Sequence, residues 1–313
     1  MSIVIVADST CDLPQKYWDN HNIEIFPFSL LIDGIKLKDT KDPVEQESFF
    51  DDDRNSKFHT ADITSLSTQQ VVNYFHENIV TKYDFALIVT ASKDRSENYN
   101  NVLGASHEVI RSYRPFREAA GLKSNFALRV VNSGTLFSGL GILVAHMRDL
   151  IEAGANKKDL RDAAEEFKAN IYTYCVPKDL YYLSTRAKST GDKSVSVFAA
   201  IIAKLLGITP VILGHMDDTV PVARIKGYEN AVNSVFDLAC SQMRAGLKSP
   251  RVVVSYAGNL NHLDGFSGYR KLQRWANKMN VEVDTSVMSI VGGLILGPGT
   301  LTVGFACGPH DFK

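Results

Sequence analysis

The sequence predicts an α/β protein of two domains, with a parallel sheet in the first domain and a mixed or antiparallel sheet in a second, α+β domain. In the first half, short apolar runs alternate with amphipathic helical patterns, which is typical of βαβ units. In the second half, Pro210–His215 and Val220–Ile225 lie too close in the chain for a crossover, so they must pair antiparallel. With 313 residues, 45% of them hydrophobic, the chain can bury two cores. We place the boundary near residue 165, giving domains 1–165 and 166–313.

Three apolar runs predict the strands of the first domain, namely Ile3–Ala7, Phe85–Thr90 and Phe126–Asn132. Helices are expected between and after them. One begins at the capping box Ser67–Gln70, a second runs from Ser138 until Gly154 ends it, and a third begins at Asn156. These alternating segments predict a parallel sheet covered by helices.

One segment of the first half does not alternate in this way. Phe26–Leu37 reads as a β-hairpin with Asp33-Gly34 at its turn, and we interpret about residues 26–39 as an inserted ribbon. The polar stretch after it is expected to hold a short helix at Glu45–Phe50. In the second half, Val252–Ser255 and residues 301–305 predict further strands, and Val195–Leu206 and Glu229–Leu247 predict helices.

Charge and cysteine content exclude several classes of protein. The 34 basic and 35 acidic residues leave a net charge of −1, so no nucleic-acid partner is expected. The four cysteines are far apart and form no CxxC motif, which gives no indication of a metal site. The apolar runs are too short to cross a bilayer, and the first residues do not resemble a secretory signal. We therefore expect a cytoplasmic protein without a membrane span, metal or cofactor.

Hydroxyl-rich loops follow the predicted strands of the first half. They are Asp8-Ser9-Thr10, Thr90–Ser96 and Asn132–Thr135, and Thr60–Ser65 precedes a helix and could join them. Because ligands bind beyond the carboxyl ends of parallel strands, these loops could bind a carboxylate or phosphate. Alternatively, the same side chains only cap helices.

Motifs for catalysis are weak. Gly292–Thr300 is glycine-rich but lacks the Gly-Lys-Ser/Thr of a phosphate-binding loop, so it is either a ligand loop or a tight turn. Gly297 and Gly299 are expected to allow positive φ or a close backbone approach. Asp217-Asp218 is interpreted as a solvated turn. The sequence contains no Gly-x-Ser-x-Gly elbow and no paired-histidine motif.

Taken in order, these segments resemble the DegV family of bacterial fatty-acid-binding proteins over nearly the whole chain. The resemblance is carried by the motifs Val6–Leu13, the 26–39 hairpin, Leu180–Leu183 with Leu205–Ile212, Val222–Gly227 and Gly297–Thr300. It implies a non-catalytic protein that binds one long-chain fatty acid in a tunnel between its two domains. It also implies a partner, a separate ATP-dependent fatty acid kinase subunit to which the carboxyl group is presented.

The resemblance also implies the residues of the binding site. Those carried over are Thr60, Ala61, Ser92, Ser96, Asn98, Ile295 and Gly297, with Lys188 facing the kinase. Several positions depart from the family pattern. Asp62 and Glu97 add negative charge, Ile295 stands where the family carries a histidine, and Lys188 replaces an arginine. Lys93 or Arg95 could offset the added charge.

Two other functions stay open on the sequence. The protein could bind another amphiphile or a small anion without a kinase partner. It could also be a phosphotransfer enzyme with Asp8 as nucleophile, although Asp8 is followed by Ser9-Thr10 rather than by a second acid. In the fatty-acid reading, Asp8 would instead hold the surrounding loops together.

Overall fold

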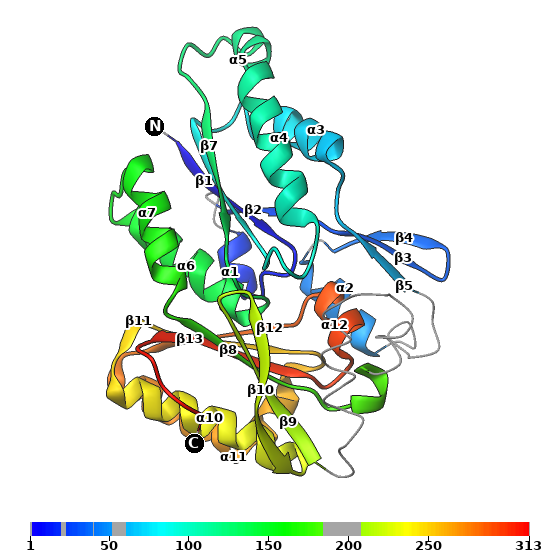
Figure 1. The fold of residues 1–313 in the computed structure, drawn as a ribbon, viewed down its shortest axis with the longest axis vertical. Helices are drawn as coiled ribbons and strands as arrows, with labels where there is room; N and C mark the ends of the chain where they lie inside the picture. The colour runs from blue at the N-terminus through cyan, green and yellow to red at the C-terminus, as the bar shows by residue number, and fades with distance from the viewer. Residues whose placement is uncertain (1, 20–22, 40, 52–60, 184–207, 313) are drawn as a thin grey trace.

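The computed structural model describes residues 2–19, 23–39, 41–51, 61–183 and 208–312. Two sheets stand one above the other, and a small three-strand ribbon lies beside the junction between them (Figure 1). The first sheet is parallel and the second is mixed, which confirms the predicted fold class. The boundary expected near residue 165 falls inside helix α7 (Lys157–Lys168), between the last strand of the first sheet and the first strand of the second, and stays a prediction.

The first sheet has the strand order β2-β1-β6-β7. Its strands are β1 (Ile3–Asp8), β2 (Ile23–Phe26), β6 (Phe85–Thr90) and β7 (Ala127–Asn132). β1 and β6 are buried along their whole length, as expected of central strands in a parallel sheet with both faces covered. Helices α3 (Thr68–Asn78) and α4 (Asn98–Ser112) pack on one face, and α5 (Arg114–Ala119) follows α4. The predicted capping box is present, because Ser67 and Gln70 satisfy each other's backbone amides.

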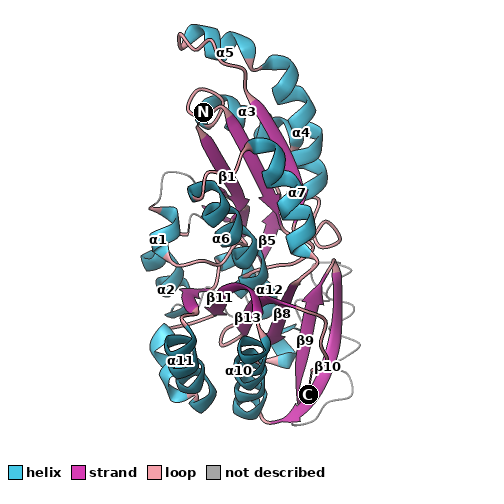
Figure 2. Ribbon diagram, turned by 90° about the vertical axis from the view of Figure 1, so that its left-hand side faces the viewer, coloured by secondary structure: helices cyan, strands magenta, loops and turns pink. Residues whose placement is uncertain are grey.

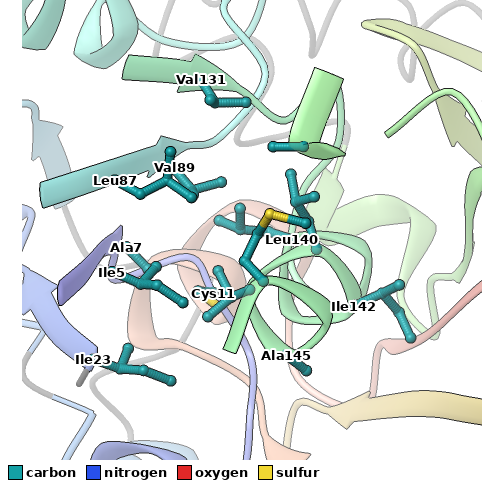
Figure 3. Packing of buried hydrophobic residues seen from close by; sticks show 14 of the residues in the cluster. Ile5, Ala7, Cys11, Ile23, Leu87, Val89, Val131, Leu140, Ile142 and Ala145 are labelled. Carbon is teal, nitrogen blue, oxygen red and sulfur yellow. The ribbon is translucent and has the colours of Figure 1, made fainter. Parts of the chain in front are cut away.

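Helix α6 (Ser138–Glu152) joins the two halves of the molecule. It packs on the other face of the parallel sheet, together with α7 and α1 (Gln15–Trp18). Figure 3 shows the strand side chains directed toward this helix, among them Ile5, Leu87 and Val89. The same apolar cluster contains Val253 and Ala306 of the second sheet. Helix α6 is therefore buried between the two sheets, and its small residues Gly139, Gly141 and Ala145 are all buried.

The inserted ribbon has three strands rather than two. β3 (Ser29–Ile32) and β4 (Ile35–Lys38) form the predicted hairpin, and the positive φ angles of Asp33 and Gly34 are those of its tight turn. The third strand, β5 (Ala61–Thr64), pairs antiparallel with β3 and was not predicted. Helix α2 (Pro43–Asp51) agrees with the expected helix at Glu45–Phe50.

The second sheet has the order β10-β9-β8-β13-β11-β12, and among these described strands only the neighbours β11 and β12 run parallel. Its strands are β8 (Ile171–Val176), β9 (Ile208–His215), β10 (Asp218–Lys226), β11 (Leu247–Tyr256), β12 (Glu282–Val287) and β13 (Leu301–Cys307). Helices α10 (Tyr228–Ala245) and α11 (Ser267–Met279) lie side by side on its outer face (Figure 2), and η2 (Leu260–Gly265) precedes α11. The predicted antiparallel pair is confirmed as β9–β10. The expected helix at Val195–Leu206 lies outside the described residues.

The glycine-rich stretch near the C-terminus is only partly a loop. Helix α12 (Ile290–Leu296) contains Gly292 and Gly293, so the expectation of one continuous loop from Gly292 is wrong. A Cβ on Gly293 would lie 2.5 Å from the ring of Phe50, and one on Gly292 would lie 2.7 Å from the side chain of Met288. Glycine is therefore required there by packing of the helix rather than by loop conformation.

Candidate functional site

A cavity of about 730 Å³ lies where the parallel sheet, the ribbon and the second sheet meet. Its wall combines the carboxyl-end loops of β1, β6 and β7, the strand β5, the inner face of the second sheet and helix α12. The residues that line it include Phe28, Ile63, Ser92, Arg95, Ser96, Asp217, Leu294, Ile295 and Thr302. Its volume lies within the range of about 300–1,000 Å³ that is common for small-molecule sites.

One part of the cavity wall is apolar. Phe28 and Ile63 come from the ribbon, and Val291, Leu294 and Ile295 come from α12. The same residues belong to one hydrophobic cluster that joins the ribbon to the helix. An apolar chain placed against this wall would gain about 0.8 kcal/mol for each buried methylene group.

Asp8 holds the loops of the polar wall in place. Its Oδ1 accepts hydrogen bonds from the amide and the hydroxyl of Thr10, and its Oδ2 accepts from the amide of Ala91, at 2.6 Å, and from Asn98 Nδ2, at 3.0 Å. Burial raises the pKa of this carboxyl, and the hydrogen bonds act in the opposite direction. The expected role of Asp8 in holding the site loops together is confirmed for the loop that contains Ser92, which it contacts at Ala91 and Asn98. A carboxylate that is 1% exposed and surrounded by four donors is poorly placed for nucleophilic attack.

Asp217 connects the polar wall to the second sheet. The Ser92 hydroxyl donates to Asp217 Oδ1 at 2.6 Å, and Asn132 Nδ2 donates to Asp217 Oδ2 at 2.8 Å. The amide of Asp217 donates to the carbonyl of Gly134 at 2.8 Å, so the β9–β10 turn is docked on the loop that follows β7 of the parallel sheet. The interpretation of Asp217-Asp218 as a solvated turn is therefore wrong for Asp217, although Asp218 is exposed.

Charges in the cavity wall are mostly negative. Asp62, Glu97 and Asp218 are exposed acidic residues of this wall, and Asp217 is partly buried. Within the part of the chain that the structure describes, Arg95 is the only basic residue of the wall. Lys93, the other candidate from the sequence, is exposed and lies outside it.

Small polar side chains from the second sheet face the cavity at its inner wall. Thr173 Oγ1 lies 2.7 Å from Thr135 Oγ1, which links the two sheets. Thr302 is fully buried, and its hydroxyl has no hydrogen-bond partner among the described residues. Cys175 is also buried, and burial raises the pKa of its thiol to about 12, so this thiol is neutral at physiological pH.

The structure brings four of the expected site residues to one cavity. Ala61, Ser92, Ser96 and Ile295 all line it. Asn98 does not, because its side chain is buried against Asp8. Thr60 and Lys188 lie outside the described residues.

Gly297 lies next to the cavity wall rather than in it. It follows α12 with a φ of +86°, and a Cβ there would lie 2.7 Å from the ring of Tyr182. Gly299 has a φ of +76°, so both glycines have the positive φ expected from the sequence. The Tyr182 hydroxyl donates to the carbonyl of Leu294 at 3.0 Å and fixes the end of the helix.

Sequence reasoning missed the contribution of the second sheet to the site. In β13 the apolar residues Leu301, Val303 and Phe305 alternate with Thr302 and Gly304. Because successive side chains of a strand point to opposite faces, this alternation places Thr302 on the face opposite the apolar core. The pattern could have identified Thr302, but no local signal identifies Asp217 as a partner of Ser92.

Fold and cavity together define a class: α/β proteins with a parallel sheet, a mixed sheet and a partly apolar cavity where the two meet. The family model described as "Uncharacterised protein, DegV family" matches residues 2–307. A DegV domain-containing protein of Xanthomonas axonopodis pv. citri is 38% identical over 313 residues, which cover 100% of both chains. The chain belongs to the DegV family.

More distant relatives carry names that describe a ligand. A protein of Thermotoga maritima named "Fatty acid-binding protein" is 24% identical, and the alignment covers 97% of each chain. The solved structure of a stearic acid-binding protein from Eubacterium ventriosum is 19% identical and has a TM-score of 0.78, covering 97% of this chain and 98% of that one. This structural similarity supports the same fold.

Two observations concern other kinds of site. In the described ranges, no three His, Cys, Asp or Glu side chains gather as a metal ion would require. Among the described helices, none is both long and apolar enough to cross a bilayer.

Proposed function

We propose that this protein binds one long-chain fatty acid in the cavity between its two domains, without catalysing a reaction itself. The observation that carries the proposal is the cavity of about 730 Å³, which has an apolar wall of ribbon and α12 residues and a polar wall of strand-end loops. This arrangement suits a molecule with a long apolar chain and one polar end. Relatives named as fatty-acid-binding proteins support the same choice of ligand.

The energetics of such a ligand are favourable. Burying about sixteen carbon atoms would contribute on the order of 10 kcal/mol before the cost of ordering the chain is subtracted. The polar end then needs only a few directed donors. Of the residues in the family pattern, the proposed contacts are Ala61, Ser92, Ser96 and Ile295, which line the cavity, and Thr60, which lies outside the described residues. Asn98 and Gly297 lie outside the wall, and we propose that they support it instead.

We further propose that the bound carboxyl group is presented to a separate ATP-dependent fatty acid kinase, with Lys188 at the contact surface. The resemblance to the DegV family supports this partner. Formation of an acyl-phosphate when this protein, a fatty acid kinase, ATP and fatty acid are combined would support it. The absence of acyl-phosphate with a kinase that is active on another DegV protein would contradict it.

Mass spectrometry of the gently purified protein tests the binding proposal. We expect one acyl chain for each protein molecule after denaturing extraction. In the variant Ile295→Trp the larger side chain fills part of the cavity, so bound lipid should decrease strongly. Ile110→Trp is the matched control, because Ile110 is 41% exposed on α4 and far from the wall. No acyl chain in the wild-type protein, or equal loss in both variants, would contradict the proposal.

A further inference from the structure

We infer that Arg95, together with the hydroxyl of Ser96, binds the carboxylate of the ligand. The inference rests on the proposed function and names the head-group site within the same cavity. Arg95 and Ser96 both line the cavity wall, in the loop between β6 and α4.

Ser92 has no hydrogen to give to a ligand carboxylate. A serine hydroxyl carries one hydrogen, and that of Ser92 is donated to Asp217 Oδ1 at 2.6 Å. Asn132, which could have assisted, donates to both carboxylate oxygens of Asp217. The carboxylate of Asp217 therefore occupies the donors of Ser92 and Asn132, which a ligand carboxylate would need at this position.

Among the residues that the structure describes, the α12 side of the cavity offers no side-chain donor near Ile295. Ile295 is apolar and packs against the hydrophobic clusters that join α12 to the ribbon and to the second sheet. Val291, Leu294 and Leu296, the other residues of this helix in the wall, are also apolar. This side therefore suits the acyl chain rather than the carboxylate.

The guanidinium N–H groups of Arg95 are available to a ligand in the cavity. Its side chain is partly buried, and its guanidinium makes no ion pair or hydrogen bond with any described residue. Its backbone amide donates to the carbonyl of Ser92 at 3.0 Å, which fixes the loop beside the Asp217 contact. A guanidinium presents five N–H groups in a planar fork that matches the two oxygens of a carboxylate.

The acidic residues of the wall do not occupy this fork. Asp62, Glu97 and Asp218 are exposed, so water screens their repulsion of a bound anion. Asp217 is already satisfied by Ser92 and Asn132. The charge left available for a ligand in the described wall is therefore the positive charge of Arg95.

Ser96, the next residue in the loop, adds a neutral donor to the same cavity wall. Its oxygen accepts a hydrogen bond from the amide of Asn98 at 3.3 Å, and its own hydrogen is donated to no described residue. A carboxylate held by Arg95 could therefore accept a further hydrogen bond from Ser96. Both contacts come from one loop, whose position is fixed by the Asp8 hydrogen bonds to Ala91 and Asn98.

Two variants separate Arg95 from general charge effects. Arg95→Gln removes the fork from the cavity wall, and Lys93→Gln removes the same charge from an exposed position in the same loop. Each protein, stripped of lipid, is tested by equilibrium dialysis with radiolabelled palmitate and with radiolabelled 1-hexadecanol. The two ligands share a chain length and differ in the charge of the polar end.

We expect Arg95→Gln to weaken palmitate binding by about tenfold or more, as is typical for the loss of a charge-assisted hydrogen bond, and to leave 1-hexadecanol unchanged. Lys93→Gln should change neither ligand, and Arg95→Lys should restore part of the palmitate affinity. Ser92→Ala should weaken palmitate less than Arg95→Gln does. Unchanged palmitate binding in Arg95→Gln, or an equal loss for both ligands, would overturn the inference. If the wild-type protein binds neither ligand, the proposed function itself fails.

Discussion

Lys41 Nζ lies 2.6 Å from Asp12 Oδ1, and the exposed fractions of the two side chains are 2% and 0%. Asp12 Oδ2 accepts a hydrogen bond from the Ser255 hydroxyl at 2.6 Å, and its Oδ1 accepts from the amide of Ser289 at 2.9 Å. The pair therefore joins the loop after β1, the segment after β4, strand β11 and the residue that precedes α12. Because α12 forms part of the cavity wall, this buried network helps to fix the position of that wall.

Lys41→Met should lower the free energy of unfolding by about 3–5 kcal/mol, because it leaves Asp12 buried without its partner charge. Lys271→Met is the control, since the Lys271–Asp237 pair is about half exposed and should contribute less than about 1 kcal/mol. Urea unfolding of both variants measures the difference. Equal effects would show that the buried pair does not stabilise the fold.

Asp39 should make stability depend on pH. Burial raises its pKa to about 6, against an opposing effect of Lys41. The folded state then holds this proton more tightly than the unfolded chain does, so Asp39 stabilises the protein at low pH, and this stability is lost as the pH rises through about 6. The effect is on the order of 3 kcal/mol.

Asp39→Asn should flatten the profile of unfolding free energy between about pH 4 and pH 7 relative to the wild-type protein. Asp264→Asn, at an exposed position, is the control and should leave the profile unchanged. Chemical denaturation at closely spaced pH values provides the measurement. A wild-type slope that survives in Asp39→Asn would assign the pH dependence to another group.

Asp8→Asn should destabilise the protein because it replaces an acceptor oxygen with a donor in a position surrounded by donors. The cost expected for buried groups left unsatisfied is about 1–3 kcal/mol each. Asn98→Ala removes only one of the four donors and should cost less. Thermal unfolding compares the two variants. A larger loss in Asn98→Ala would contradict the role of Asp8 as the centre of these loops.

Gly297→Ala should destabilise the protein more than Gly34→Ala. Both glycines have positive φ angles, +86° and +81°, but Gly297 also has a ψ of 162°, a backbone region that is essentially restricted to glycine, so an alanine there adds strain of about 1–3 kcal/mol. Gly34 has open space around it, whereas a Cβ on Gly297 meets the ring of Tyr182 at 2.7 Å. The difference between the two unfolding free energies measures the backbone strain at Gly297 together with its packing against Tyr182. Equal losses would leave no role for this contact.

Local patterns predicted most of the regular structure. Alternating apolar runs identified β1, β6 and β7, and Asp33-Gly34 identified the hairpin turn. β5 was missed because no turn motif marks its four residues as part of a hairpin. Its partner β3 is also distant in the chain, so no local pattern indicates the pairing. Gly292 and Gly293 were interpreted as loop residues because glycine is unfavourable in helices, and packing against aromatic rings overrides that preference in α12.

For the candidate site, too, some features could be predicted from the sequence and others could not. The sequence by itself determined the fold class, the polar loops at the carboxyl ends of the strands and the positive φ of Gly297, because each depends on residues close in the chain. Only the tertiary structure decided that Asp217 takes the hydrogen of Ser92, a residue 125 positions away, and that Arg95 rather than Lys93 lies in the cavity wall. The physical reason is that hydrogen-bond partners and burial depend on how the two sheets pack together, and no local pattern records that packing.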